Sequence, residues 1–340
     1  RLAAACAARM SGLLYLLDEP TAGLHPSERP RLRERLEALV AEGNTVVCVE
    51  HDAVMLRHAD YVVELGPGAG EEGGTIVFDG TPSALRRAPT ATGKALKAGG
   101  ATVRTRREPA GWIELDGASG HNLRSVDLAL PRGVMTCVTG VSGSGKSSLV
   151  LETLLPAVQR KLGLKSEGAP LRHETIKGFA SLHGVVGVDQ APLGRTSRGN
   201  AATYLKVWDV FRKRFAATET AKERGYKPGI FSFNVAGGRC EACRGDGAET
   251  VEMQFLADVV FSCPECQGRR FVGPVLDVKY MGLDVAQVLQ LTAQQAADRF
   301  AGDALIRKAL APLLDVGLGY LRLGQPLNTL SGGEAQRLML

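Results

Sequence analysis

Residues 134–148 read VMTCVTGVSGSGKSS, an apolar run that leads directly into glycines, a lysine and two serines. The apolar run predicts a buried strand over residues 134–140, and a helix is expected from about Lys146 onward. Residues 140–148 fit the pattern G-x-x-x-x-G-K-[ST], in which glycines let backbone N–H groups wrap phosphates between a strand and a helix. The stretch therefore predicts an α/β fold that binds a nucleoside triphosphate.

This phosphate loop gives its side chains distinct roles. Lys146 is expected to neutralise the β- and γ-phosphates, and Ser147 to ligate Mg²⁺. The alternative is a glycine-rich turn before an ordinary helix, which the flanking apolar run and helix disfavour. The candidate ATP-binding residues of the loop are Gly140, Ser142, Gly143, Gly145, Lys146, Ser147 and Ser148.

Two adjacent acids close another apolar run, LLYLLDEP at residues 13–20. Asp18 suits the Mg²⁺ shell, and Glu19 suits orienting or deprotonating an attacking water. His51 follows the next apolar run. Because the carboxyl ends of neighbouring parallel strands meet at one sheet edge, we expect His51 near Glu19 and a γ-phosphate. The alternatives are a helix start for the acids and a structural histidine for His51.

The N-terminal region has the pattern of a βαβ unit. The apolar runs at 13–17 and 45–49 are typical of parallel strands buried on both faces. Residues 28–44 place Leu32, Leu36, Leu39 and Val40 on one helical face, and the expected helix ends at Gly43, which suits a C-terminal cap. Further strands are expected at 61–65 and 74–80, followed by a short helix capped by Ser83.

The seven cysteines fall into two groups. Three of them, Cys6, Cys48 and Cys137, stand singly in apolar surroundings and are expected in a core. The other four form two C-x2-C pairs that are 19 residues apart, the spacing of a zinc site, and each pair continues as C-x-G to make a tight knuckle. Four thiolates leave no open position on the metal, so the predicted zinc is structural. Its ligands are Cys240, Cys243, Cys263 and Cys266.

Residues 190–230 carry nine Lys or Arg and three acids, more positive charge than the formal +5 of the whole chain. Aromatic residues are interleaved with these basic residues. The combination suits a surface that contacts nucleic-acid phosphates and stacks on bases. A solvated basic helix whose aromatic residues face the core is the alternative. The aromatic residues that suit such a surface, in and just after this stretch, include Tyr204, Trp208, Tyr226, Phe231 and Phe233.

The bulk composition is that of an ordinary globular protein. The 340 residues are 44% hydrophobic and 23% charged, which suggests two or three folded domains. The longest apolar runs fall short of the roughly 18 residues that a membrane span needs, and no signal segment opens the chain. We therefore expect a cytoplasmic protein without membrane contact.

Together, these motifs resemble the ATP-binding cassette ATPases. The shared motifs are the phosphate loop, the acidic strand followed by AGLHP, the histidine after the next strand, and LSGGE at 330–334. A complete cassette runs from phosphate loop through glutamine loop and signature to acidic strand and histidine. Here the acidic strand comes first, so the chain is expected to hold the back of one cassette and the front of a second. We expect this stretch alone to hydrolyse ATP negligibly, because each paired site is half present.

The resemblance extends to one family within this class. GLH in place of the usual GLD, DQAPLGRTSRGNAATY at 189–204, and RGYKPGIFSFNVAGGRCEACRGDG at 224–247 are similar to the UvrA family, the DNA-damage-recognising ATPases of bacterial nucleotide excision repair. The resemblance covers nearly the whole chain. It implies an α/β fold of tandem cassette parts with a zinc-containing α+β insertion in the second. The expected divisions are 1–93 (first cassette), 94–111 (linker), 112–194 (second cassette), 195–329 (insertion, with the zinc module at 240–266) and 330–340 (signature helix).

The resemblance also implies site residues and partners. Asp18, Glu19 and His51 become the metal-binding, catalytic and γ-phosphate-sensing residues of the first site, and Gln190 becomes the glutamine-loop residue of the second. Implied contacts to the first nucleotide come from Ser331, Gly332 and Gly333. Implied contacts to duplex DNA come from Arg195, Arg198 and Lys206. The implied cofactors are ATP, Mg²⁺ and structural Zn²⁺, and the implied partners are duplex DNA with lesions, UvrB and a second copy of the protein.

Two departures from the family pattern leave alternatives open. Residues 117–126 contain no aromatic residue to stack on adenine, unless His121 substitutes. Thr21 and Ala22 replace a common Ser-Ile, which leaves room for a UvrA-like paralogue linked to drug resistance. Outside the family, a transport or drug-resistance cassette and a zinc-dependent peptide-binding module remain as alternatives. Transport cassettes lack paired cysteines in their insertion, so the zinc pattern speaks against the first of these two.

Overall fold

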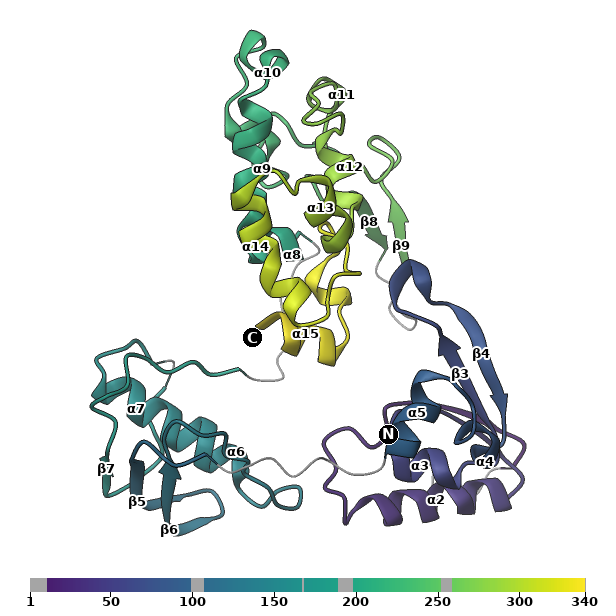
Figure 1. The fold of residues 1–340 in the computed structure, drawn as a ribbon, viewed down its shortest axis with the longest axis vertical. Helices are drawn as coiled ribbons and strands as arrows, with labels where there is room; N and C mark the ends of the chain where they lie inside the picture. The colour runs from purple at the N-terminus through teal and green to yellow at the C-terminus, as the bar shows by residue number, and fades with distance from the viewer. Residues whose placement is uncertain (1–10, 99–106, 167, 189–197, 252–258, 340) are drawn as a thin grey trace. The chain divides into compact units, whose positions relative to one another are not determined.

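The computed structural model describes residues 11–98, 107–166, 168–188, 198–251 and 259–339. The chain forms two compact units, and both mix helices with strands (Figure 1). Unit 1 contains residues 1–68 and 72–187, and unit 2 contains residues 69–71 and 188–340. No helix in the described ranges is long and apolar enough to cross a membrane.

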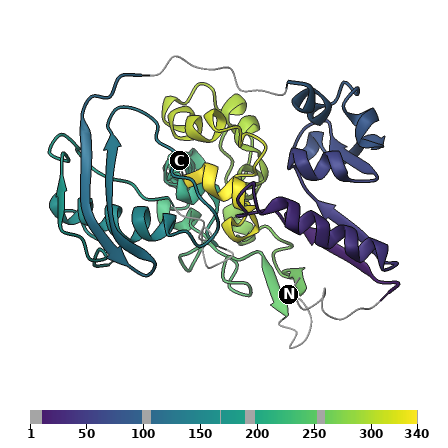
Figure 2. The same cartoon turned by 90° about the horizontal axis from the view of Figure 1, so that it is seen from below.

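Unit 1 begins with the βαβ unit that the sequence predicts. Strand β1 (Leu14–Asp18) pairs in parallel with β2 (Thr45–Val49). Helix α2 (Arg29–Ala41) connects the two strands, lies against β2 and buries Leu36 and Leu39 (Figures 1 and 2). This arrangement brings the carboxyl ends of both strands to one edge, where functional residues of parallel sheets gather.

Burial of this parallel pair on both faces was expected and is wrong for the described part of the chain. Leu16 is 70% exposed, and its register partner Val47 is 48% exposed. Leu14 and Val49 are exposed on the same face, while the alternate residues are half-buried. The pair therefore packs on α2 with one face only.

The rest of the N-terminal region of unit 1 is an antiparallel pair with short helices. Strand β3 (Val62–Gly66) pairs with β4 (Thr75–Gly80), and the helices are α3 (Ala53–His58), α4 (Pro82–Leu85) and α5 (Ala91–Ala98). The expected cap at Ser83 is wrong, because the Thr81 hydroxyl accepts the hydrogen bond from the Ala84 backbone N–H at 3.4 Å. Helix α5 also continues into the segment from residue 94 that was expected as linker.

The second region of unit 1 packs one helical run on an antiparallel sheet. Strands β5 (Trp112–Gly120), β6 (Leu123–Pro131) and β7 (Thr175–Lys177) lie in the order β6–β5–β7. The helical run is α6 (Lys146–Leu149), the π-helical η2 (Val150–Leu154) and α7 (Leu155–Lys161). Leu115, Val158 and Ile176 form the core between them.

Residues 134–140 do not form the strand that the sequence predicts. No described strand pairs with them, and a strand without a neighbour leaves its backbone N–H and C=O groups unpaired. Met135 is 89% exposed and Cys137 is exposed, so the expectation of a core cysteine is also wrong there. Cys48 is half-buried, and Cys6 lies outside the described residues.

Unit 2 is mainly helical, and among its described residues strands β8 and β9 form an antiparallel pair. Helix α14 (Ala304–Asp315) lies beside α9 (Val207–Ala216) (Figure 1), and Asp303 at the start of α14 pairs with Arg214 of α9. The elements are α8 (Ala201–Tyr204), α9 (Val207–Ala216), α10 (Glu219–Glu223), η3 (Pro228–Phe231), β8 (Ala248–Val251), β9 (Val259–Ser262), α11 (Gly273–Leu276), α12 (Val285–Gln290), α13 (Ala293–Arg299), α14 (Ala304–Asp315), η4 (Leu327–Thr329) and α15 (Gly332–Met339).

The core of unit 2 takes up most of the aromatic residues that interleave with the basic ones. Trp208 is 2% exposed, and Phe231 and Phe233 are fully buried in ring contacts with their neighbours. Tyr204 is 42% exposed, and Tyr226 is half-buried. A stacking surface built from these rings is therefore wrong, and the alternative of a solvated basic helix with a buried aromatic face holds.

Candidate functional site

The phosphate loop stands at the start of helix α6. Gly145, the residue before the helix, has a left-handed φ of 98°. A Cβ atom there would lie 2.9 Å from the Asn122 Oδ1 atom and 3.0 Å from a Leu123 methyl carbon. Backbone conformation and space therefore both favour glycine at this position.

Lys146 folds back over the loop. Its Nζ atom donates to the carbonyl oxygens of Gly140 at 2.8 Å and Val141 at 2.7 Å. Ser147, in the first turn of the helix, is exposed. An ammonium group thus stands beside a helix N-terminus, whose first N–H groups lack partners within the helix, and both attract anions.

The loop is held by two neighbouring segments of unit 1. The Asn122 Nδ2 atom donates to the Gly143 carbonyl oxygen at 2.8 Å. Ser142 contacts the AGLHP region, since its hydroxyl donates to the Gly23 carbonyl oxygen at 3.1 Å and its N–H donates to the Glu28 carboxylate at 3.2 Å. The Nε2 atom of His121, the candidate substitute for an adenine-stacking residue, lies 3.0 Å from the Glu152 carboxylate.

Glu19 and His51 meet at the carboxyl edge of the parallel pair, as the strand pairing predicts. The His51 Nδ1 atom lies 3.9 Å from the Glu19 Oε1 atom, and both side chains are exposed. Glu19 has a left-handed φ of 42°, which is uncommon outside glycine. The two residues line a cleft of about 300 Å³ together with residues 21–24. Asp18, the last residue of β1, is exposed at the same edge.

Glu50 organises this edge, and the sequence reading missed it. One carboxylate oxygen accepts from the Thr21 N–H at 2.9 Å and from the Thr21 hydroxyl. The other accepts from the N–H groups of His51 at 3.0 Å and Asp52 at 3.1 Å. Burial raises the pKa of Glu50, but these hydrogen bonds outweigh it and the pKa is lowered overall. The available signal was a carboxylate directly after the apolar run at 45–49 and before His51.

The four paired cysteines form one buried cluster, as their spacing predicts. All Sγ atoms lie within 4.8 Å of one another. The Sγ atoms of Cys240 and Cys263 are 3.9 Å apart, and those of Cys243 and Cys266 are 3.7 Å apart. Tetrahedral zinc with Zn–S bonds of about 2.3 Å implies sulfur separations of about 3.8 Å. The donor set and its spacing therefore fit Zn²⁺.

The protein surroundings disfavour the thiolate form of two of the four cysteines. Burial raises the pKa of Cys266 to about 12, and burial also raises the pKa of Cys243. The backbone N–H of Cys266 has the opposite effect on Cys263, whose pKa is lowered. A metal that binds thiolates would have to displace the protons of the first two groups, which couples zinc binding to pH.

The signature residues begin helix α15 in a capping box. The Ser331 N–H donates to the Glu334 carboxylate at 2.8 Å, and the Glu334 N–H donates back to the Ser331 hydroxyl at 3.3 Å. Tyr320 also donates to Glu334 at 2.7 Å. Gly332 and Gly333 are exposed, with open space where a Cβ would stand. The helix start is therefore braced on one side and open on the other.

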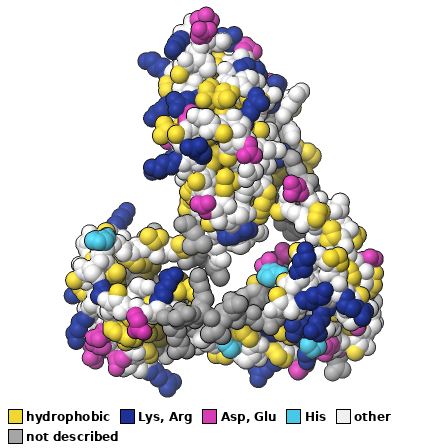
Figure 3. Space-filling view, in the orientation of Figure 1, with side chains coloured by type: hydrophobic (Ala, Val, Ile, Leu, Met, Phe, Trp, Pro, Cys, Tyr) yellow, Lys and Arg dark blue, Asp and Glu magenta, His cyan; other side chains and the backbone are white. Residues whose placement is uncertain are grey.

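The expected DNA-binding residues differ in their surroundings. Arg198 forms a two-pronged ion pair with Asp246, at 3.1 and 3.3 Å. Lys206 is exposed just before α9. Arg195 and Gln190 lie outside the described residues. Basic side chains gather on the side of unit 2 that carries α9 and α10 (Figure 3); the exposed ones there are Lys206, Lys213, Lys222, Arg224 and Lys227.

Comparisons with known proteins agree along the whole chain. UvrABC system protein A of Methanothermobacter thermautotrophicus is 47% identical over 344 residues, which cover 100% of this chain and 36% of the relative. The Bacillus subtilis protein of the same name gives the same identity and coverage. The crystal structure of UvrA2 from Deinococcus radiodurans matches with a TM-score of 0.91 and 49% identity, over 99% of this chain and 41% of that one. No family model matches.

These similarities cover the phosphate loop, the acidic edge, the cysteine cluster and the signature helix in one continuous match. The chain spans 36% of the length of the curated relatives, so it matches one region of them. Along its whole length, the chain is a relative of UvrABC system protein A.

Proposed function

We propose that the protein is a DNA-damage-recognising ATPase that acts as the A subunit of a UvrABC excinuclease, binding distorted duplex DNA and loading UvrB. The observation that carries this proposal is the 47% identity along the whole chain to relatives named UvrABC system protein A. Dimerisation with a second copy and a cytoplasmic location belong to the same proposal. The cysteines among the described residues form no disulfide, which suits a reducing compartment.

In this proposal, residues 140–148 bind the phosphates of ATP in the second cassette. The glycines admit the phosphates, Lys146 neutralises their charge, and Ser147 ligates Mg²⁺. Gln190 would contact the metal and the attacking water. The open start of α6 and the ammonium beside it support this assignment.

The acidic edge serves the other cassette. Asp18 would hold Mg²⁺, Glu19 would orient or deprotonate water, and His51 would sense the γ-phosphate. The 3.9 Å approach of His51 to Glu19 supports a shared site. Ser331, Gly332 and Gly333 would complete the site on the nucleotide that the first cassette holds. The contact of Ser142 with the AGLHP region supports pairing of the two cassettes.

Duplex DNA would bind to the basic side of unit 2. Arg195, Arg198 and Lys206 are the proposed contacts, and the exposed lysines of α9 and α10 extend the positive surface. Contacts of this kind bind phosphates without regard to sequence and weaken with salt. Zinc on the four cysteines would fix the module that carries Asp246, the ion-pair partner of Arg198.

A UvrA-like paralogue is the second candidate. The observation that favours it is the 49% identity to the protein named UvrA2. Both candidates predict nucleotide binding and DNA binding, so lesion preference is the property that separates them.

Filter binding with duplex DNA, with and without a lesion and at two salt concentrations, tests the proposal. We expect tighter binding to the damaged duplex and a loss of affinity at the higher salt. Equal affinity for both duplexes would favour the paralogue. Absence of DNA binding at low salt would contradict both candidates.

A further inference from the structure

The two cysteine knuckles are related by a repeated pattern of contacts. In the first, the N–H of Gly247, four residues after Cys243, donates to the Cys243 sulfur at 3.2 Å. In the second, the backbone N–H of Arg270, four residues after Cys266, is hydrogen-bonded to the Cys266 sulfur. Each of these residues also offers its carbonyl oxygen to the opposite knuckle: Gly247 to the Cys263 N–H at 3.0 Å, and Arg270 to the Cys240 N–H at 2.8 Å.

The equivalent positions differ in residue type although they share a conformation. Gly247 has a left-handed φ of 76°, and Arg270 has a left-handed φ of 69°. Glycine adopts this region without strain, whereas a residue with a Cβ does not. An arginine at a position that suits glycine indicates that its side chain has a role that offsets the strain.

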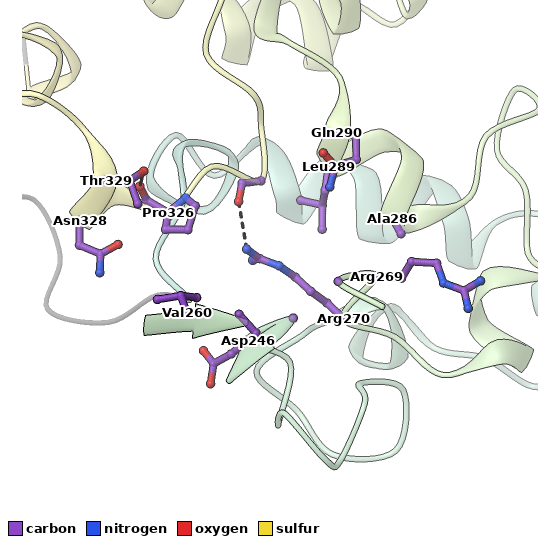
Figure 4. Close-up of a pocket in the computed structure, with 14 residues that line it drawn as sticks. Asp246, Val260, Arg269, Arg270, Ala286, Leu289, Gln290, Pro326, Asn328 and Thr329 are labelled. Carbon is purple, nitrogen blue, oxygen red and sulfur yellow. Dashed lines mark hydrogen bonds between the residues drawn. The ribbon is translucent and has the colours of Figure 1, made fainter. Parts of the chain in front are cut away.

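The Arg270 side chain leaves the knuckle and reaches into a cleft of about 520 Å³ in unit 2 (Figure 4). Its Nη2 atom donates to the Gly324 carbonyl oxygen at 3.1 Å, and its guanidinium lies 5.6 Å from the centre of the Phe233 ring. Its Nη1 atom is buried and has no hydrogen-bond partner among the described residues. Arg269 points the other way and is exposed.

Gly324 belongs to a segment, residues 322–330, that leads into the signature helix and that we call the strap. The Gly324 N–H donates to the Leu289 carbonyl oxygen at 2.7 Å, and a Cβ at Gly324 would lie 2.9 Å from that oxygen. The Leu327 N–H donates at 2.8 Å to the carbonyl oxygen of Gly199, which directly follows Arg198. Arg270 is thus a link from the cysteine cluster to the strap.

We propose that Arg270 is a positioning residue that transmits the state of the cysteine cluster to the strap, and through it to the start of helix α15. Zinc would fix the backbone of Arg270 from both knuckles, and the side chain would then hold Gly324. Without zinc, the backbone of Arg270 loses its support and the strap loosens. The proposal rests on the proposed function only in treating residues 331–333 as nucleotide contacts.

Hydrogen exchange of the strap amides with and without zinc tests this link. The informative variant is Arg270→Gly, because glycine suits the backbone at this position. With zinc bound, we expect Arg270→Gly to raise exchange at Gly324, Gln325 and Leu327 by about tenfold, the effect of losing one hydrogen bond to a charged donor. Zinc affinity, measured by competition with a chelating dye, should change by less than about threefold, because the knuckle backbone keeps its conformation.

Two further variants control for charge and position. Arg269→Gly removes the neighbouring exposed arginine and should leave strap exchange as in the unmodified protein. Arg270→Lys keeps a donor on a long side chain and should restore part of the protection. In the unmodified protein, zinc removal should raise strap exchange. In Arg270→Gly, zinc removal should raise strap exchange little further, because the hydrogen bond from Arg270 to Gly324 is already lost.

Three results would overturn the proposal. The first is normal strap exchange in zinc-loaded Arg270→Gly. The second is loss of zinc by Arg270→Gly, which would mean that the side chain serves the knuckle itself. The third is strap exchange in the unmodified protein that does not respond to zinc. None of these measurements uses ATP or DNA, so failure of the proposed function leaves them interpretable.

Discussion

At the residue scale, Glu50 connects the two segments of the acidic edge. It accepts hydrogen bonds from both segments that carry the candidate catalytic groups. In Glu50→Gln, one carboxylate oxygen is replaced by an NH₂ group, which cannot accept the hydrogen bonds from the Thr21 N–H or from the His51 and Asp52 N–H groups. Hydrogen bonds to charged groups stabilise by about 1.5–3 kcal/mol each, so protection of the Thr21 or His51 amides against exchange should fall at least about tenfold. The exposed Glu42→Gln is the matched control and should leave both amides unchanged.

The same carboxylate predicts a pH dependence. The pKa of Glu50 is lowered from 4.5 in the folded protein, because hydrogen bonds to the carboxylate outweigh the opposing effect of burial. A lowered pKa gives stability that is present above the unfolded-state value and is lost as pH falls through the folded-state value. Protection of the Thr21 amide should therefore decrease below about pH 4.5 in the unmodified protein. A protection factor independent of pH from 6 to 3 would refute this role for Glu50.

A second effect at the residue scale is expected from substitution of Gly145, which should weaken ATP binding. In Gly145→Ala the methyl group would meet Asn122 and Leu123, and the left-handed backbone costs a non-glycine residue about 1–2 kcal/mol. We expect ATP affinity, measured by calorimetry, to fall at least about tenfold, because the loop must shift. Gly163→Ala has a similar φ of 69° with open space around it and should bind ATP normally. An equal loss of ATP affinity in the two variants would show that backbone strain near this helix, and not the phosphate loop, controls binding.

At the element scale, we expect the fold of the cysteine knuckles to depend on bound zinc. Their four side chains form a cluster of their own, separate from the aromatic core of unit 2. In the proposed zinc site, metal coordination would stand in for hydrophobic packing around these four side chains. Removal of zinc with a chelator should make residues 240–266 sensitive to protease while α9 and α14 stay protected, and added zinc should restore resistance. Unchanged cleavage of residues 240–266 after chelation would contradict a structural zinc site.

The elements show what local patterns can and cannot predict. Strands β1 and β2, helix α2 and the two knuckles follow from periodicity and spacing, because neighbours along the chain form them. Residues 134–140 carry an equally apolar pattern but lie outside any described strand. A strand needs a partner, and an apolar run does not reveal whether a partner is present. Trp208 and Phe233 likewise look the same in sequence whether they face a core or a nucleic acid.

The candidate site was predictable to the extent that its residues sit in motifs. The approach of His51 to Glu19 follows from parallel pairing. Glu50 and Arg270 were missed, because each acts through long-range hydrogen bonds that no spacing encodes. The positive φ of Arg270, which shows that an arginine occupies a glycine-like position, is visible only in the structure.

At the scale of the whole molecule, the chain joins pieces that have different chemistry. Unit 1 carries the phosphate loop and the acidic edge, and unit 2 carries the cysteine cluster, the basic side and the signature helix. Nucleotide is the proposed ligand of the phosphate loop, the acidic edge and the signature residues, and DNA is the proposed ligand of the basic side. If the nucleotide and DNA sites are coupled, bound nucleotide should change the affinity for DNA. Bound DNA should then change the affinity for nucleotide by the same factor.

The most direct measurement is the ratio of affinities for damaged and undamaged duplex DNA, with and without ATP, in the unmodified protein and in Lys146→Ala. Lys161→Ala, at the exposed end of the same helical run, is the control. We predict a preference for damaged DNA that changes with ATP in the unmodified protein and in Lys161→Ala but does not respond to ATP in Lys146→Ala. A ratio of one, or a ratio in the unmodified protein that ATP leaves unchanged, would contradict the account.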